Sequence, residues 1–150
     1  MLIDKQNQFS ADTGDSPTSI GSTASTNIID LGIARDIGGA VTDQLMLLCQ
    51  VTTAFTSGGS ATLQVQFQTA PDNGSGLPGS WSTLAQSDVI PVASLVQSYK
   101  FLPSEVPGGT LLFIRLNYVI GTAAMTAGTL KAALVPSLDM QPAYARAYAA

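Results

Sequence analysis

The sequence contains no histidine, and Cys49 is its only cysteine. Histidine is the commonest general base near neutral pH and a frequent metal ligand, so Ser-His-Asp triads, Cys-His dyads and histidine-based zinc sites are excluded. A single cysteine forms neither an intramolecular disulfide nor a Cys-x-x-Cys site. Because Cys49 lies in the apolar run LMLLCQV, we expect it to be a small buried hydrophobic side chain.

Charged residues are scarce as well, at 11% of the 150 residues against roughly 25% in an average soluble domain. The net charge is −4, and the six Lys and Arg residues are widely scattered, so we expect no basic patch for nucleic acid. No pair of carboxylates is marked as the two flanking acids of a glycosidase. We therefore expect a protein that is not an enzyme and has no metal or cofactor. Its low charge is typical of a subunit of an assembly.

Long hydrophobic segments are also missing. The opening MLIDKQNQFS carries charge where a signal peptide needs an apolar core. The longest apolar runs, such as LLFI at 111–114, are far too short to span a membrane. We therefore expect synthesis in the cytoplasm and no membrane association. A length of 150 residues suits one domain.

The segment 61–84 is the most informative part of what is present. Three apolar residues alternate with three glutamines over residues 63–68, which predicts a strand with one apolar face and one face of uncharged amides. A loop rich in Gly, Pro, Asp and Asn follows at 71–79, and a second strand begins at Trp81. This pattern predicts a β-hairpin with a long presented loop, and its amide face suits packing against another protein.

The remaining segments have the same short, β-like character. Strands separated by Gly and Pro signals are expected at 27–31, 45–55, 61–70, 81–85, 89–92, 95–101, 111–120 and 129–135. No segment has helical periodicity longer than two turns. We expect an all-β fold, an antiparallel sandwich of about eight strands. A jelly roll fits the strand count and the long connections best, and an immunoglobulin-like sandwich is the alternative.

The two ends of the chain differ in composition from this predicted sandwich at 26–138. Residues 1–25 are rich in Ser, Thr, Asp and Gly, which predicts an extended N-terminal arm that is ordered only where it touches a partner. Deleting the arm is expected to leave a folded domain. Residues 139–150 form an Ala-rich C-terminal tail.

Both ends carry candidate partner-binding residues. On the arm these are the apolar side chains Leu2, Phe9 and Ile20. On the tail they are Tyr144, Arg146 and Tyr148. The two tyrosines are four residues apart and share one face of a short helix if one forms, so docking onto a neighbouring subunit and disorder are the two interpretations of this tail.

Three other features each allow a site or a purely structural role. The loop sequence PDNGSG offers oxygens for calcium, but it holds one carboxylate and is better explained as a turn. Trp81 and the tyrosines suit either core packing or a sugar platform. Arg115 lies inside an apolar strand, and the alternation there places it facing solvent or a neighbouring subunit.

Several of these stretches resemble a known family. Residues 67–83, FQTAPDNGSGLPGSWST, resemble a hairpin of the capsid cement (decoration) proteins of short-tailed bacteriophages. The opening MLIDKQNQFS and the phrase STNIIDLGIARDIGG at 25–39 are similar to the N-terminal portion of the same family. These matches cover most of the first 85 residues in order, whereas the later half matches in its general β character.

The resemblance implies a jelly-roll protein on the outer surface of an icosahedral phage head. Such a protein is made in the host cytoplasm, becomes part of the virion, and stabilises the head by bridging major capsid proteins. It has no catalytic residue and no cofactor, and it acts as a small homo-oligomer, with a dimer favoured and a trimer as the alternative. Competing hypotheses are another virion component, such as a head fibre or tail part, and a carbohydrate-binding β-sandwich module that uses Trp81.

Overall fold

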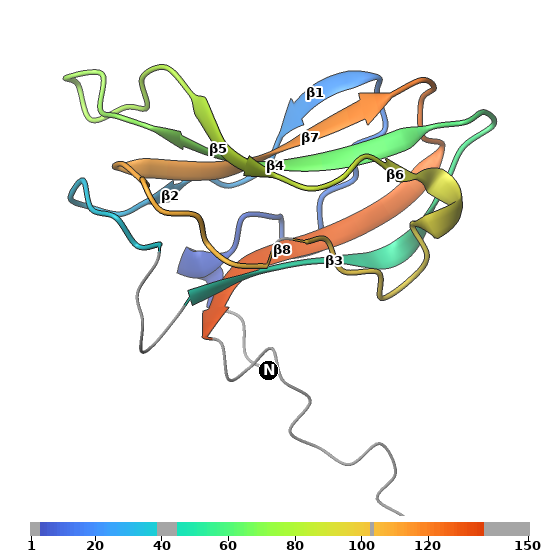
Figure 1. Ribbon diagram of the computed structural model, residues 1–150, viewed down its shortest axis with the longest axis horizontal. Helices are drawn as coiled ribbons and strands as arrows, with labels where there is room; N and C mark the ends of the chain where they lie inside the picture. Colours follow the sequence, from blue (N-terminus) through green and yellow to red (C-terminus); the bar gives the residue numbers. More distant parts are fainter. Residues whose placement is uncertain (1–3, 39–44, 103, 137–150) are drawn as a thin grey trace, which may run out of the picture.

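The computed structural model describes residues 4–38, 45–102 and 104–136 (Figure 1). These residues form strands and two short 3-10 helices, and they contain no α-helix and no helix able to cross a membrane. The strands are β1 (Gly21–Ala24), β2 (Ile29–Asp30), β3 (Leu45–Thr56), β4 (Thr62–Ala70), β5 (Ser82–Gln86), β6 (Ile90–Pro91), β7 (Phe113–Gly121) and β8 (Ala127–Pro136). The 3-10 helices are η1 (Lys5–Asn7) and η2 (Val92–Ser94).

The larger sheet is built around the antiparallel pair β4 and β7, which runs in unbroken register from Thr62↔Gly121 to Ala70↔Phe113. β1 and β2 both pair with β7, one along each half of its length. β5 and β6 divide the free side of β4 in the same way. The sheet therefore has four strand positions. β1 and β2 together form one edge, β7 and β4 form the middle, and β5 and β6 together form the other edge.

The smaller sheet consists of β3 and β8, and isolated bridges extend it on both sides. Gln8 and Asp15 pair with residues of β8. Lys100 and Glu105 pair with residues of β3. This sheet therefore also has four positions, occupied in order by residues 8–15, β8, β3 and residues 100–105.

The order of the eight segments is that of a jelly roll. Counted along the chain, the eight segments are residues 8–15, β1 with β2, β3, β4, β5 with β6, residues 100–105, β7 and β8. The first, eighth, third and sixth lie side by side in the smaller sheet. The second, seventh, fourth and fifth lie side by side in the larger one. Two Greek keys wound in this way give the jelly-roll sandwich. The structure therefore confirms the predicted all-β antiparallel sandwich.

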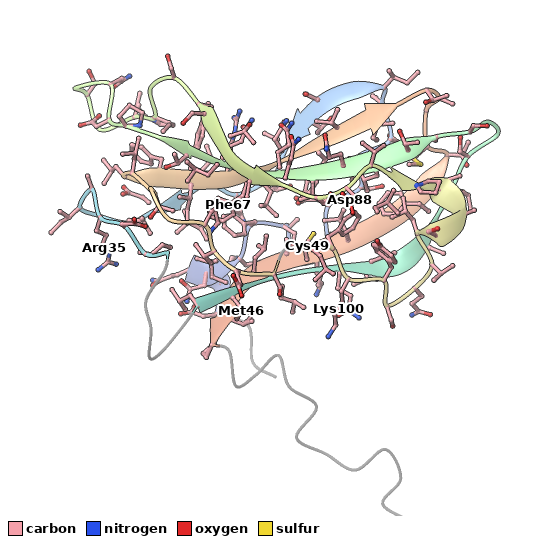
Figure 2. The ribbon with its side chains drawn as sticks, viewed as in Figure 1. Arg35, Met46, Cys49, Phe67, Asp88 and Lys100 are labelled. Atoms are coloured by element: carbon pink, nitrogen blue, oxygen red, sulfur yellow. The ribbon has the colours of Figure 1, made fainter. Side chains whose placement is uncertain are left out.

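The apolar core lies between the two sheets, where Cys49 and Phe67 point toward each other's layer (Figure 2). Alternate residues of each long strand face inward. On β7 these are Ile114, Leu116, Tyr118 and Ile120, on β4 Leu63, Val65 and Phe67, and on β3 Leu47, Cys49, Val51 and Phe55. Cys49 is 1% exposed, which confirms the prediction of a buried small side chain. Burial raises the pKa of its thiol far above the ordinary value, so the thiol is unreactive in the folded protein.

The expected strand at 95–101 is irregular in the structure. Ser98 has a φ of 71°, a left-handed conformation that interrupts a strand. Leu95 and Phe101 on either side of it are nevertheless buried in the core. The segment pairs with β3 only locally, through bonds such as that from Phe101 N–H to the carbonyl of Cys49 (2.9 Å).

The N-terminal segment differs most from the sequence expectation, because described residues of 1–25 lie within both sheets rather than in a separate arm. Phe9 was expected to be a partner-binding anchor, yet it is 0% exposed and packs edge-to-face on Phe67 with ring centroids 6.0 Å apart. Its backbone N–H donates to the carbonyl of Ala132 (2.9 Å). The polar composition was misleading because the buried polar side chains here, such as Ser10, satisfy hydrogen bonds inside the fold.

Asp15 is the centre of this arrangement. Its backbone exchanges both hydrogen bonds with Leu130 of β8, at 2.8 and 3.0 Å. Its buried carboxylate accepts from the hydroxyl of Tyr118 on β7 (2.9 Å), from the hydroxyl and N–H of Thr26, and from the N–H of Ala11 (3.0 Å). Burial, together with the neighbouring Cys49 and Asp15, raises the pKa of Tyr118 well above its ordinary value, so the phenol stays a neutral donor. One side chain thus joins the smaller sheet to the larger one.

Replacing Phe9 by Ala is expected to lower the free energy of unfolding by about 3–5 kcal/mol, because it leaves a cavity in the core. Ile20→Ala, at a side chain that is 62% exposed, is the matched control and should change stability by less than about 0.5 kcal/mol. Urea denaturation measures both values. Equal, small effects would show that the N-terminal segment is peripheral, as the sequence alone indicated.

Asp15→Ala should cost at least about 3 kcal/mol, because each donor stranded in the interior costs about 1–3 kcal/mol. The control is Asp12→Ala, which removes an exposed carboxylate that lies 3.6 Å from Lys5. Surface pairs of this kind contribute about 0–1 kcal/mol. Thermal and urea unfolding of the two variants give the comparison, and similar losses would contradict a central role for Asp15.

Candidate functional site

The outer face of the larger sheet is lined by uncharged amides, as the alternation of the hairpin predicted. On β4 the outward residues include Gln64, Gln66 and Gln68. The register places Gln66 opposite Asn117 and Gln68 opposite Arg115 on β7. Gln64 and Gln66 are partly exposed, whereas Gln68 and Asn117 are buried, so this face carries little charge and part of its amide set is already enclosed.

These amides hold one another in place. The Gln66 side-chain oxygen accepts from the Asn117 amide (2.8 Å) and, at a longer 3.4 Å, from that of Gln68. The Gln68 amide also reaches the hydroxyl of Thr83 on β5 (3.3 Å). Side chains fixed in this way lose little conformational entropy when a partner binds, so the face is preorganised for contact.

Arg115 stands at one end of this network and is clamped from two directions. Its Nε–H donates to the side-chain oxygen of Gln68 (2.9 Å). Its guanidinium lies over the ring of Trp81, with Cζ 4.1 Å from the ring centroid, which is a cation–π contact. Partial burial lowers the pKa of Arg115 from its ordinary value, although the group stays protonated. Arg115 thus faces outward as predicted, and Trp81 packs on it.

The loop that precedes Trp81 is ordered by its own side chains. Asp72 Oδ1 accepts from the N–H groups of Gly74 (3.0 Å) and Gly76 (2.9 Å). These bonds confirm a turn, and the described residues hold no cluster of three acidic, Cys or His side chains for a metal. Leu77 is 59% exposed in this loop, which projects beside the larger sheet (Figure 1). The presented loop is therefore rigid and carries an apolar side chain outward.

A second loop lies at the same end of the sandwich as the hairpin loop, where Figure 2 labels Arg35. Asp36 fastens it to the loop before β7 by accepting from Gly109 N–H (2.8 Å), and it braces its own loop by accepting from Gly38 N–H (3.0 Å). These bonds lower the pKa of Asp36 below its ordinary value of 3.8. Ile33 in this loop is 75% exposed. This end of the molecule thus presents two braced loops with exposed apolar side chains.

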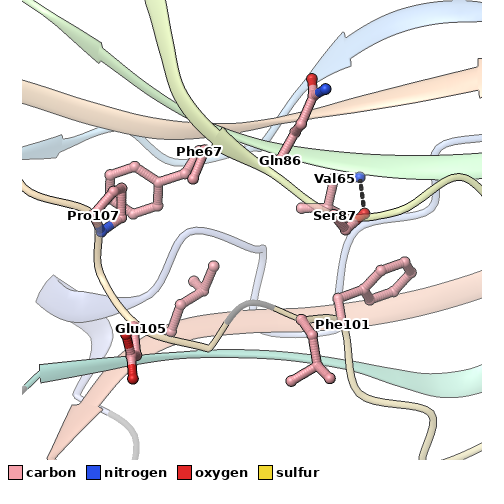
Figure 3. Close-up of a pocket in the computed structure, with 10 residues that line it drawn as sticks. Val65, Phe67, Gln86, Ser87, Phe101, Glu105 and Pro107 are labelled. Carbon is pink, nitrogen blue, oxygen red and sulfur yellow. Dashed lines mark hydrogen bonds between the residues drawn. The ribbon is translucent and has the colours of Figure 1, made fainter.

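A small recess opens between β5 and the segment 101–107 (Figure 3). Val65 and Phe67 are among the apolar residues that line it, and the Ser87 hydroxyl beside them accepts from Val65 N–H (3.0 Å). Its volume is about 10 Å³, on a measure in which one water molecule requires roughly 10–15 Å³. The recess is a gap at the edge of the core and has no room for a small-molecule ligand.

Of the six residues proposed from sequence as partner contacts, the structure describes two, Phe9 and Ile20. Ile20 is exposed, as a contact residue requires, whereas Phe9 belongs to the core. Leu2, Tyr144, Arg146 and Tyr148 lie outside the described residues. Sequence reasoning noted Arg115 and Trp81 separately, but it missed their contact because the pairing depends on how β5 returns beside β4.

The Asp36 brace should weaken in acid. A carboxyl group whose pKa is lowered by folding stabilises the protein above its unfolded-state pKa, and this contribution is lost as the pH falls through the folded-state value. Asp36→Asn is therefore expected to lower the melting temperature at neutral pH, and its difference from the wild type should shrink as the pH falls below 3.8. Thermal unfolding over a pH series measures this, with Asp12→Asn as control. A difference that is independent of pH would contradict the role given to the Asp36 charge.

Comparison with known proteins identifies the family. A family model named Bbp16 matches residues 14–134, which span almost the entire jelly roll from the Asp15 contact to β8. No curated protein matches the chain. Because the match covers well over half of the sequence, the chain belongs to the Bbp16 family.

Proposed function

We propose that this protein is a structural cement, or decoration, protein that binds the outer surface of an icosahedral phage head and bridges its major capsid proteins. The observation that carries the proposal is the outer face of the larger sheet, where a fixed network of uncharged amides ends at the stacked pair Arg115 and Trp81. Interfaces are enriched in aromatic residues and Arg and depleted of Lys and Glu, and this face has that composition.

The two braced loops support the same function. The hairpin loop with Leu77 and the loop with Ile33 lie at the same end of the sandwich, and the hairpin loop projects beside the larger sheet. Apolar tips on rigid loops suit insertion between neighbouring subunits of a lattice. Because each such contact is weak, binding gains strength when one molecule engages several subunits at once.

The sequence resemblance supports the proposal at the same place. The stretch 67–83, which resembles a hairpin of phage capsid cement proteins, builds the end of β4, the hairpin loop and Trp81. One of the three resembling stretches therefore supplies Gln68 and Trp81, the two side chains that contact Arg115. Under this proposal the protein is part of the virion after synthesis in the host cytoplasm, and it needs no cofactor, nucleic acid or membrane.

Self-association completes the proposal. A homodimer, rather than a trimer, would bridge the two sides of a contact between capsid subunits. Ile20, which is exposed, and the tail residues Tyr144, Arg146 and Tyr148 are the candidate contacts for the partner copy or the capsid. The carbohydrate-binding alternative is less favoured, because the Arg115 guanidinium covers one face of the Trp81 ring that a sugar would stack on.

Size-exclusion chromatography with light scattering tests this function. The purified chain is run alone, with loose major capsid protein, and with empty heads from a phage that carries a Bbp16-family protein, after that protein has been stripped. A dimer that co-elutes with heads in near-stoichiometric amounts and ignores loose subunits is the expected result, because a bridging site exists only in the lattice. A monomer that ignores heads would refute the proposal. A much lower copy number would instead indicate a tail or fibre component.

A further inference from the structure

We infer that Arg115 and Trp81 form a recognition site for an acidic side chain of a partner protein, on the outer face of the larger sheet. The site itself follows from the geometry of this chain, and only the identity of the partner, a capsid protein, rests on the proposed function. The ligand chemistry is a single carboxylate of Asp or Glu.

The position of Arg115 is fixed before any partner arrives. It lies on β7, an inner strand of the sheet, opposite Gln68 of β4. Its Nε is held by Gln68, and Trp81 covers one side of the guanidinium plane. A planar guanidinium held in this way has already lost the rotamer freedom that an arginine in solution loses on binding.

The remaining edge of the guanidinium is available. Its two terminal Nη groups make no hydrogen bond within the described residues, and no buried side-chain nitrogen or oxygen there lacks a partner. The Nη groups must therefore be reached by solvent. Together they form the fork of donors that binds a carboxylate with two parallel hydrogen bonds.

The charge of this site is unbalanced within the chain. Among the described residues, the ion pair that forms is Lys5 with Asp12, at 3.6 Å, and none involves Arg115. A partly buried cation loses hydration, and a nearby carboxylate offsets that loss. The flanking groups Gln66, Gln68 and Asn117 are neutral amides that cannot supply it. A carboxylate from another protein would complete the site.

A protein carboxylate fits this surface better than a phosphate polymer. Nucleic acids are held by several cations together, whereas Arg115 is one guanidinium among amides on a chain with a net charge of −4. Beside it, the partly exposed Gln66 and the exposed Thr83 are suited to hydrogen bonds with the backbone and polar side chains that flank an acidic residue on a protein surface, whereas Gln68 and Asn117 are buried and serve to hold the site.

The first experiment uses the purified chain alone. Trp81 is the only tryptophan, so its fluorescence reports on the site directly. Titration with hexaglutamate at low salt is expected to give a saturable change in the millimolar range, which added salt removes. Arg115→Gln should weaken this response at least tenfold. Lys131→Gln, which removes a cation from β8 in the other sheet, should leave it unchanged. No response of the wild type, or an equal response of Arg115→Gln, would overturn the inference.

The second experiment uses the stripped heads. Arg115→Gln is expected to lower head affinity at least tenfold and to reduce its salt dependence, and Lys131→Gln should do neither. Arg115→Lys keeps the charge but loses the planar fork, so its head affinity should lie between those of Arg115→Gln and Lys131→Gln. If Arg115→Gln fails to fold, Arg115→Lys takes its place in the comparison. Melting temperatures verify folding. Full affinity of both Arg115 variants would refute the site while leaving the cement function standing. Wild-type protein that ignores heads would refute the cement function, and the hexaglutamate titration alone would then decide the site.

Discussion

The structure depends on a carboxylate buried between its two sheets. The backbone of Asp15 pairs with Leu130 at the edge of the smaller sheet. Its side chain accepts a hydrogen bond from the hydroxyl of Tyr118 on the larger sheet. Because stranded donors in an interior are costly, these groups must meet for the sandwich to close. The same contact keeps the N-terminal segment in the fold, where Phe9 fills the core beside Phe67. The contact that joins the two sheets is thus also the contact that fixes the N-terminal segment in the fold.

The closed core determines where a partner can bind. The inner faces of both sheets are used for packing, so interaction chemistry is left to the outer faces and the loops. On the larger sheet the outward residues form a hydrogen-bonded set of amides that ends at Arg115 and Trp81. Asp72 and Asp36 brace the neighbouring loops. A surface whose side chains and loops are held in place suits a mechanical role, because a partner is held without the molecule having to rearrange.

Much of the fold could be predicted from the sequence, because the alternation of apolar and polar residues along a strand involves only neighbouring residues. The expected strand at 45–55 corresponds to β3 (Leu45–Thr56), and the hairpin and its amide face are as predicted. The place of the N-terminal segment within the sheets could not be predicted, because its polar composition is that of a solvated arm. Their hydrogen-bond partners, such as Tyr118, lie about a hundred residues away in the chain. Arg115 and Trp81 were each visible, but their contact was not.

The sequence by itself determined the class of the fold, the absence of histidine-based chemistry and the two-faced character of the hairpin, since alternation and composition are properties of neighbouring residues. Only the tertiary structure decided that residues near Phe9 belong to the core and that Arg115 is stacked on Trp81 with its outer edge free. The physical reason is that burial and charge pairing depend on which distant segments are brought side by side. A strand pattern specifies which face is apolar, but the strand order specifies what that face meets.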